Sequence, residues 1–492
     1  MNVSPGSFER QFRRLLDECA PVVRSDRATA LGLADLFRFT FEPGDQARTL
    51  LHALQNMLLG ETIRHARANT VFYAGPDYAD GSERQLFRAP DLTCWPVLNR
   101  QTIIDNFNDF MSASATFSSA CHTSGATGPS LSIYKSTEEL SFLWQFYQRL
   151  MKPALSGEHP RPLMLSFPNL YHGVAVRLPS HGKVFVSGVT DDLLIEDAVK
   201  VLQKTYAIPG HDSRISVLSG LSYQIEFFTH YLLEQGYDPK EFGIKSINVV
   251  GNYTPDYCKT FLTDAWDAIL CERFTLTESA GGALRCFKCG HYHLDCHVVG
   301  EVVDPDDARP IEAGIGHLLL TQLYPFVQMQ PLIRYVTGDL VRRIDSDCSN
   351  GLTFDFLGKS VNCISLKVDG AAHWVLFPAD LYEIINTIPD IRLFENFPTV
   401  TRAHDRTVGS PPIYTQTVSE PDDGPMTIEL TFELRYAPQR YADRAETLRR
   451  QIINGLRSAQ TDLARFMDQG LVVLTVRFVG PGALGNAIRM KI

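Results

Sequence analysis

Short apolar runs alternate with longer amphipathic stretches between Pro162 and Val250, and this alternation constrains the fold more than any other feature of the sequence. The runs LMLSF, KVFVSGV and SINVV have the length of strands, whereas LIEDAVKVLQKTY and YQIEFFTHYLLEQGY repeat apolar residues at helical spacing. Strands that alternate with helices form layered α/β domains. From Gly281 to Asp345 the sequence is rich in β-prone residues, which predicts a sheet packed beside the α/β core.

A chain of 492 residues is expected to form two or three domains, and one large plus one small domain fits the pattern. Residues 1–355 are expected to form a large N-terminal α/β domain. It would begin with a helical region over about residues 1–95, where apolar residues recur at helical spacing. Residues 356–492 alternate strand and helix patterns over a length that suits a small, mobile C-terminal α+β domain.

The composition is that of an ordinary globular protein, with 44% hydrophobic and 21% charged residues. The formal net charge of −10 gives no general attraction to nucleic-acid phosphates or anionic lipid, so small molecules or carrier proteins are favoured as partners. The N-terminal MNVSPGSFERQFRR has no apolar run of signal-peptide length, and no later segment approaches a membrane-spanning length. We therefore expect a cytoplasmic protein, with a homodimer left open.

A glycine-rich turn, HTSGATGPS, occupies residues 122–130. Glycines let backbone N–H groups approach phosphate oxygens, and the Ser and Thr hydroxyls add further donors. The turn is not a Walker loop, because no Gly-Lys-Ser/Thr ends it. Taken alone, it is compatible with phosphate binding and with an ordinary loop.

Further segments, in order along the chain, are similar to motifs of the phenylacetate-CoA ligase family, a branch of the adenylate-forming enzymes. The turn HTSGATGPS resembles the family's TSGTTG phosphate loop. The other matches are KSINVVGNY (245–253) for the stretch beside adenine, FTLTE (274–278) for YGLTE, LIRYVTGDL (332–340) for RYRTGD, and the structural segments HLDCHVVGEVVDP (293–305) and GAAHWVLFPADLYE (370–383). They run from about residue 96 to the C-terminus. The resemblance implies the adenylate-forming enzyme fold, an α/β large domain with packed sheets plus a small α+β domain.

The resemblance also implies ATP-dependent activation of an aryl or small carboxylic acid to its acyl-adenylate. That reaction is an in-line attack on the α-phosphorus, so the site must neutralise phosphate charge and fix the geometry. By resemblance, Thr277 and Glu278 are assigned to catalysis, with Glu278 holding Mg²⁺, and Asp339 is assigned to the ribose hydroxyls. The remaining residues that the resemblance assigns to ATP are Thr123, Ser124, Gly125, Thr127, Gly128, Gly251, Asn252 and Tyr253.

Several charged positions of the family are changed in this chain. The family's C-terminal lysine, which reaches the α-phosphate, is replaced by Asn486, and an amide cannot supply a cation. Lys491 or Arg489 is the candidate substitute if the tail folds back, and Lys359 keeps a charge at the expected interdomain hinge. Pro129 and Val336 stand where the phosphate loop and the ribose strand usually carry Lys and Arg.

The segment FPNLYHGVAV (167–176) matches the part of the family beside the acid, which makes Tyr171, His172 and Gly173 the expected substrate contacts. The acyl acceptor is left open between coenzyme A, a carrier-protein thiol and an amine. Because of Asn486, a non-catalytic nucleotide-binding relative is a further alternative. A serine or cysteine hydrolase is disfavoured, since the sequence has no G-x-S-x-G elbow.

A cluster of cysteines and histidines, CFKCGHYHLDCH, occupies residues 286–297. A C-x₂-C pair followed by glycine can turn both thiolates toward one ion, and Zn²⁺ favours four N or S ligands in a tetrahedron. We expect a structural Zn²⁺ that staples a β-hairpin. The expected ligands are four of the five residues Cys286, Cys289, His291, His293 and Cys296, and reduced thiols in a plain hairpin are the alternative.

Overall fold

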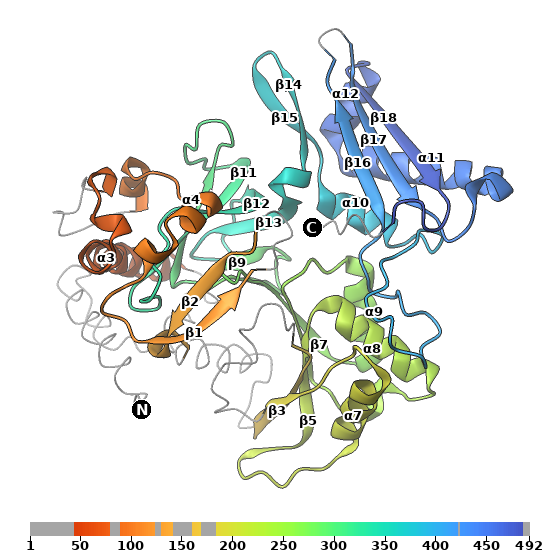
Figure 1. Cartoon of the computed structure of the whole chain (residues 1–492), viewed down its shortest axis with the longest axis horizontal. Coiled ribbons are helices and arrows are strands. Elements are labelled where there is room, and N and C mark those ends of the chain that lie inside the picture. The colour runs from red at the N-terminus through yellow and green to blue at the C-terminus, as the bar shows by residue number, and fades with distance from the viewer. Residues whose placement is uncertain are drawn as a thin grey trace. The chain divides into compact units, whose positions relative to one another are not determined.

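The computed structural model describes residues 44–78, 89–123, 129–140, 160–168, 184–421 and 424–485 (Figure 1). The chain forms two compact units, each built from separate stretches of sequence. Unit 1 comprises Met1–Arg161, Pro168–Val184 and Cys271–Phe356, and unit 2 comprises Pro162–Phe167, Phe185–Leu270 and Leu357–Ile492. The chain passes from unit 1 to unit 2 for the last time between Phe356 and Leu357, next to the domain boundary expected at residue 355. Unit 2 also takes in residues 185–270, which the sequence pattern assigns to the large domain.

The regular elements of unit 1 are mostly strands. They are α3 (Asp45–Asn69), α4 (Arg100–Asp105), β1 (Phe117–His122), β2 (Ser132–Ser136), β7 (Ile269–Phe274), β8 (Ala283–Arg285), β9 (Tyr292–Leu294), β10 (Val298–Val303), β11 (Gly314–Gln322), β12 (Tyr335–Ile344) and β13 (Thr353–Lys359). Strands β1 and β2 form a hairpin, and the others follow the sheet order β10-β11-β12-β13-β9-β8-β7. The β-rich stretch expected over residues 281–345 thus forms most of this sheet.

Helix α3 packs on unit 1 through one apolar face. Leu51, Leu54, Leu58 and Ile63 are each at most 2% exposed and recur three to five residues apart, close to the spacing of one helical face. These side chains share a core with Trp95 and with residues of the β12 region. The part of the expected helical region before residue 44 lies outside the described residues.

The elements of unit 2 alternate strands and helices. They are β3 (Arg161–Ser166), β4 (Val184–Val186), α7 (Asp192–Gln203), β5 (His211–Gly220), α8 (Ser222–Glu234), β6 (Ser246–Val250), α9 (Asp256–Trp266), β14 (Ile364–Val368), β15 (Ala371–Leu376), α10 (Pro378–Ile385), β16 (Tyr414–Ser419), β17 (Met426–Glu433), α11 (Ala442–Ala459), α12 (Thr461–Asp468) and β18 (Val472–Val479).

The first part of unit 2 has the expected α/β layering. Its strands follow the order β6-β5-β3-β4, and β5 pairs with β6 in parallel. Helix α8 connects these two strands, as parallel pairing requires. Segment 394–410 packs on the same helices, because Phe397 and Val400 belong to their core and Thr401 bonds to Asp192 at the start of α7. These contacts explain why residues 185–270 and the C-terminal stretch form one unit.

The C-terminal part of unit 2 is a three-stranded sheet with two helices on it (Figure 1). Strand β17 lies in the centre, antiparallel to β16 and parallel to β18. Helix α11 buries Leu448, Ile452 and Leu456, which are spaced four residues apart and face the sheet core. This part is the expected α+β arrangement. Within the described residues, no helix is both long enough and apolar enough to cross a membrane.

Candidate functional site

The stem of the glycine-rich turn is held by the β1–β2 hairpin. Thr123 directly follows β1 and is 8% exposed. Its hydroxyl accepts a hydrogen bond from the Leu131 amide at 2.8 Å, and its own amide donates to the Leu131 carbonyl at 2.9 Å. The Ser130 hydroxyl donates to the Thr123 carbonyl at 2.6 Å. Both ends of the turn are therefore fixed, while Ser124, Gly125, Thr127 and Gly128 lie outside the described residues.

Arg100 joins this stem to the rest of unit 1. Asn99 caps α4 by accepting a hydrogen bond from the Thr102 amide at 2.9 Å, so the helix begins at Arg100. The Arg100 guanidinium donates to the Pro129 carbonyl through Nε at 2.9 Å and Nη2 at 2.6 Å, and Nη2 also donates to the Thr123 hydroxyl. A cation is thereby placed directly against both ends of the glycine-rich turn.

The same guanidinium faces the carboxylate of Glu278. Arg100 Nη1 lies 3.9 Å from Glu278 Oε1, and the side chains are 23% and 9% exposed. The Tyr335 hydroxyl donates to the same oxygen at 3.1 Å. Burial raises the pKa of Tyr335 strongly and the Glu278 carboxylate raises it further, so the phenol keeps its proton and acts as a donor. Thr277, the neighbour of Glu278, lies half-buried in the same turn.

Backbone pairing explains why Arg100 and Tyr335 lie close together. The Leu98 amide donates to the Arg334 carbonyl at 3.0 Å, and the Val336 amide donates to the Leu98 carbonyl at 2.9 Å. Leu98 and Tyr335 therefore form a parallel bridge at the start of β12. Because Arg100 is two residues beyond Leu98, its position is tied to this strand.

Asp339 lies on β12 and is 1% exposed. Its amide donates to the Thr337 hydroxyl at 3.1 Å. Alternate residues of a strand point to the same face, so Tyr335 and Asp339 share one face of β12. The carboxylate of Asp339 also contributes to the raised pKa of Tyr335, which agrees with this arrangement.

The segment 251–253 follows β6 in unit 2. Gly251 has a φ of +78°, a left-handed backbone conformation that favours glycine. The Asn252 side chain donates to the Ser222 hydroxyl at 2.6 Å and accepts from the Ser222 amide at 3.1 Å. This fixes the end of β6 to the N-terminus of α8, at the carboxyl ends of two parallel strands.

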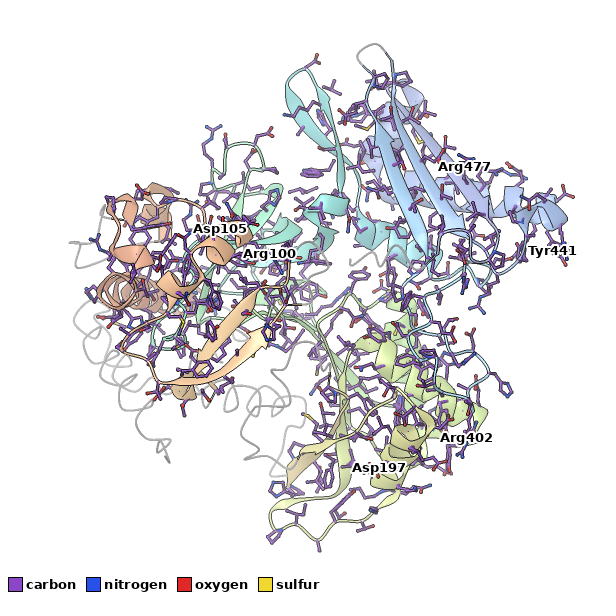
Figure 2. The ribbon with its side chains drawn as sticks, in the orientation of Figure 1. Arg100, Asp105, Asp197, Arg402, Tyr441 and Arg477 are labelled. Atoms are coloured by element: carbon purple, nitrogen blue, oxygen red, sulfur yellow. The ribbon has the colours of Figure 1, made fainter. Side chains whose placement is uncertain are left out.

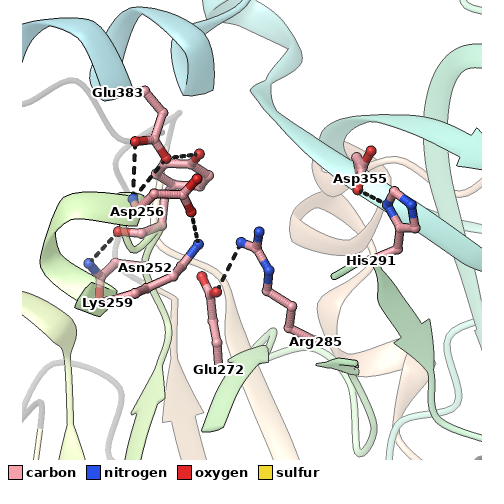
Figure 3. A network of polar contacts seen from close by, with 9 residues as sticks. Asn252, Asp256, Lys259, Glu272, Arg285, His291, Asp355 and Glu383 are labelled. Atoms are coloured by element: carbon pink, nitrogen blue, oxygen red, sulfur yellow. Dashed lines mark hydrogen bonds and ion pairs between the residues drawn. The ribbon is translucent and has the colours of Figure 1, made fainter. Parts of the chain in front are cut away.

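Tyr253 is held by a carboxylate from α10. Its hydroxyl donates to Glu383 Oε1 at 2.6 Å, and the Asp256 amide at the start of α9 donates to both oxygens of Glu383 at 3.1 and 3.0 Å (Figure 3). Burial raises the pKa of Glu383, and the Tyr253 hydroxyl opposes that effect. The three residues lock the conformation of the segment expected beside adenine.

The remaining expected residues are placed as follows. Lys359 ends β13 and is half-buried, and its carbonyl accepts the Cys363 thiol at 3.5 Å. Tyr171, His172 and Gly173 lie outside the described residues, as do Asn486 and Lys491. The expected roles of these five residues stay predictions.

The cysteine and histidine cluster differs from the expected ligand set. The side chains brought together are Cys286, Cys289, His293 and Cys348. His291 instead pairs with Asp355, Nδ1 to Oδ1 at 2.6 Å (Figure 3). Cys296 is 2% exposed and packs in the core around α3. His291 and Cys296, two of the five expected ligands, thus lie outside this group, and Cys348, which the sequence pattern did not include, lies within it.

Sequence reasoning missed three residues of these sites: Arg100, Tyr335 and Cys348. Arg100 has a local signal, an Asn cap before a short helix, but that signal does not say what the guanidinium faces. Tyr335 stands within the LIRYVTGDL segment, yet its partner Glu278 is 57 positions away. Cys348 is 62 positions from Cys286, so spacing within the cluster could not reveal it.

The chain matches known proteins in structure but not in sequence searches. No protein-family model matches the chain, and no curated protein sequence matches it. A solved structure of 2-hydroxyisobutyryl-CoA ligase in an open conformation, in complex with 2-HIB-AMP and CoA, superimposes with a TM-score of 0.62 at 14% identity, covering 92% of this chain and 93% of that chain. The same ligase in a postadenylation state gives a TM-score of 0.60 at 15% identity, with 92% and 89% covered. In its thioesterification state the values are 0.53 and 16%, with 92% and 91% covered.

The chain therefore shares the mixed α/β fold of these solved ligase structures, which match 92% of its length. This confirms the fold class expected from the strand and helix pattern. At these identities the likeness concerns the fold, and the phenylacetate-CoA ligase-like branch stays a prediction.

Proposed function

We propose that this chain uses ATP and Mg²⁺ to activate a carboxylic acid as its acyl-adenylate and then transfers the acyl group to an acceptor. The observation that carries the proposal is the group formed by Arg100, Glu278 and Thr123 at the stem of the glycine-rich turn. A buried carboxylate and a cation face each other there beside a loop of phosphate-binding composition. Such a group suits a site that binds a metal–triphosphate.

Arg100 would supply the positive charge that the loop sequence lacks. The transfer at the α-phosphorus builds negative charge on phosphate oxygens, and preorganised donors stabilise that charge in a site shielded from water. The guanidinium already donates to Pro129 and Thr123, so its position costs little reorganisation on binding. Its planar donors match phosphate oxygens in pairs. This cation offers a reason why a chain with Asn486 could still activate an acid.

Glu278 and Asp339 would make the remaining polar contacts, one to the metal ion and the other to the ribose. Glu278 offers a hard oxygen to Mg²⁺, which neutralises phosphate charge when bound. The Tyr335 hydroxyl orients that carboxylate from the same face of β12 that carries Asp339. Asp339 would accept the ribose hydroxyls.

The adenine would lie against the segment Gly251–Asn252–Tyr253. Ligands of open α/β sheets bind outside the carboxyl ends of the parallel strands, and this segment directly follows β6. Its hydrogen bonds to Ser222 and Glu383 preorganise it for stacking against a flat base.

Coenzyme A is the acceptor that we favour, with a small or aryl acid as substrate. Support comes from the solved 2-hydroxyisobutyryl-CoA ligase structure that holds 2-HIB-AMP together with CoA. A carrier-protein thiol or an amine stays an alternative acceptor. Tyr171, His172 and Gly173 are proposed to border the acid.

The test of adenylation is ATP–pyrophosphate exchange with Mg²⁺ across aryl, short aliphatic and amino acids. We expect exchange with one acid class, and Arg100→Ala should lower the exchange kcat/KM by about 100- to 1,000-fold. Arg477→Ala is the matched control, because Arg477 is exposed on β18 (Figure 2) and pairs with Glu429 on the neighbouring strand β17. This control should retain wild-type exchange.

Two outcomes would go against the proposal. If the chain binds ATP but exchanges with no acid, the non-catalytic nucleotide-binding alternative is favoured. If exchange occurs and Arg100→Ala leaves it unchanged, Arg100 is not the compensating cation. Once an acid is known, trapping the product with CoA, a carrier protein or an amine identifies the acceptor.

A further inference from the structure

Four side chains of unit 1 converge at the β8–β9 turn, apart from the proposed adenylation site. They are Cys286, Cys289, His293 and Cys348, and their ligand atoms all lie within 4.8 Å of one another. Cys286 Sγ is 3.6 Å from Cys348 Sγ, and Cys289 Sγ is 3.2 Å from His293 Nε2. Three sulfurs and one imidazole nitrogen thus occupy the corners of a small polyhedron.

The Cys286–Cys348 and Cys289–His293 separations are close to the edges of a zinc tetrahedron. With Zn–S bonds of about 2.3 Å and Zn–N bonds of about 2.0–2.1 Å, tetrahedral angles put two sulfurs about 3.8 Å apart and a sulfur and a nitrogen about 3.5 Å apart. The observed values of 3.6 and 3.2 Å fall a few tenths of an ångström below these edges. The other ligand atoms lie within 4.8 Å of one another, so side-chain shifts of up to about 1 Å would bring all four to one ion.

The backbone of the turn is already shaped for the two thiols of the C-x₂-C pair. The Cys286 amide donates to the His291 carbonyl and the Gly290 amide donates to the Cys286 carbonyl, both at 2.9 Å. The Lys288 amide donates to Cys286 Sγ at 3.4 Å. Gly290 adopts a φ of +76°, which lets the chain reverse between Cys289 and β9. Such N–H donors favour the thiolate form, which is the form that binds metals.

We propose that Cys286, Cys289, His293 and Cys348 bind a structural Zn²⁺ ion. Three thiolates and one imidazole form a soft donor set that selects Zn²⁺ over Mg²⁺ or Ca²⁺. Four protein ligands complete the tetrahedron and leave no position for a reactive water, so the ion takes no part in the chemistry. The site is independent of the proposed adenylation function.

The ion would join two segments of unit 1. Cys348 belongs to the connection between β12 and β13, whereas Cys286 and Cys289 belong to the β8–β9 turn and His293 to β9 itself. Next to Cys348, the Asn350 side chain accepts from the Gly44 amide at 3.1 Å, and the Ser349 carbonyl accepts from Arg48 at 3.5 Å, so the same connection holds the start of α3. The metal would therefore stabilise the β8–β9 turn, the β12–β13 connection and, through that connection, the start of α3.

Elemental analysis of the full chain, purified under reducing conditions without chelator, tests the stoichiometry. We expect about one zinc per chain, and Cys348→Ser should reduce it to less than about a tenth of that value. Cys296→Ser and His291→Ala are matched controls, since these residues stood in the sequence-based ligand set but bond elsewhere. Both controls should keep the zinc.

Cobalt substitution of the wild-type chain gives a test that does not depend on a variant folding. Co²⁺ should bind with intense tetrahedral d–d bands and thiolate charge-transfer bands. Absence of zinc together with absence of a Co²⁺ spectrum would overturn the proposal. So would full zinc retention in Cys348→Ser with loss in Cys296→Ser, or a Cys286–Cys348 disulfide found by mass spectrometry in the freshly purified chain.

Discussion

Replacing Arg334 with methionine is expected to destabilise unit 1, because it leaves a carboxylate buried without its partner. The Arg334 guanidinium binds Glu301 through Nε at 3.1 Å and Nη2 at 3.0 Å, and the two side chains are 4% and 8% exposed. Nη1 also donates to the Trp95 carbonyl at 2.7 Å. This pair therefore joins β10 and the start of β12 to the segment that leads to Arg100.

The size of the effect follows from burial. Removing one partner of a buried ion pair costs about 3–5 kcal/mol, since the remaining charge keeps its desolvation penalty. Within that total, the loss of the donor to the Trp95 carbonyl accounts for about 1–3 kcal/mol and does not depend on pH. The remainder comes from the charge on Glu301 and depends on its protonation.

The pH dependence has a definite sign. Burial raises the pKa of Glu301 above its ordinary value of 4.5, and Arg334 opposes this by its charge and its hydrogen bond. The folded protein thus holds this proton to higher pH than the unfolded chain, so the contribution of Glu301 to stability is greatest below its ordinary pKa and declines as pH rises through the folded pKa. Without Arg334 the folded pKa rises further, and the decline extends to higher pH. The destabilisation by Arg334→Met must therefore grow with pH.

Urea denaturation at about pH 5.5 and about pH 8, followed by circular dichroism, measures this difference. We expect about 3–5 kcal/mol at the higher pH and a smaller cost at the lower one. The double variant Arg334→Met/Glu301→Met should recover much of the loss, because apolar side chains replace buried ion pairs at little cost. Arg343→Met is the control, since Arg343 on the same strand pairs with Glu312, whose side chain is 86% exposed, and should cost below about 1 kcal/mol. An equal cost at both pH values, or a double variant no more stable than the single one, would refute the reasoning.

Three further predictions concern the proposed nucleotide site. Asp339→Ala should weaken ATP binding by about 100-fold or more through loss of two charge-assisted hydrogen bonds; an unchanged affinity in calorimetry, with the fold intact, would remove the ribose assignment. Tyr335→Phe should lower the free energy of unfolding by about 1–3 kcal/mol and raise the Mg²⁺ concentration needed for half-maximal exchange, because Glu278 loses its donor; an unaltered Mg²⁺ titration would contradict this. Glu383→Gln should raise the KM for ATP several-fold with little change in kcat, because Tyr253 loses a charged acceptor; a fall in kcat alone would argue for a different role.

The sequence by itself determined the fold class. Hydrophobic periodicity is a local property, so runs such as SINVV and YQIEFFTHYLLEQGY indicate a strand and a helix without reference to distant residues. The order of such elements, with the motif resemblance, was enough to predict the adenylate-forming enzyme fold. It also brought Thr123, Glu278 and Asp339 into consideration, each from a short motif.

Local sequence patterns could not show which stretches of the chain pack together in each unit. Residues 394–410 pack on α7 and α8 through Phe397, Val400 and Thr401. Their local sequence does not indicate that they pack on these helices, because apolar residues in a loop have no periodicity that shows which surface they cover.

Only the tertiary structure decided which side chains meet. Arg100 faces Glu278 because Leu98 bridges to β12, and the Tyr335 hydroxyl reaches the same carboxylate across 57 positions of sequence. In the same way Cys348 lies beside Cys286, Cys289 and His293, whereas His291 and Cys296 lie outside that group. The period of a strand shows which residues share a face. The identity of the neighbouring strand is set by long-range packing, and these side-chain contacts depend on that neighbour.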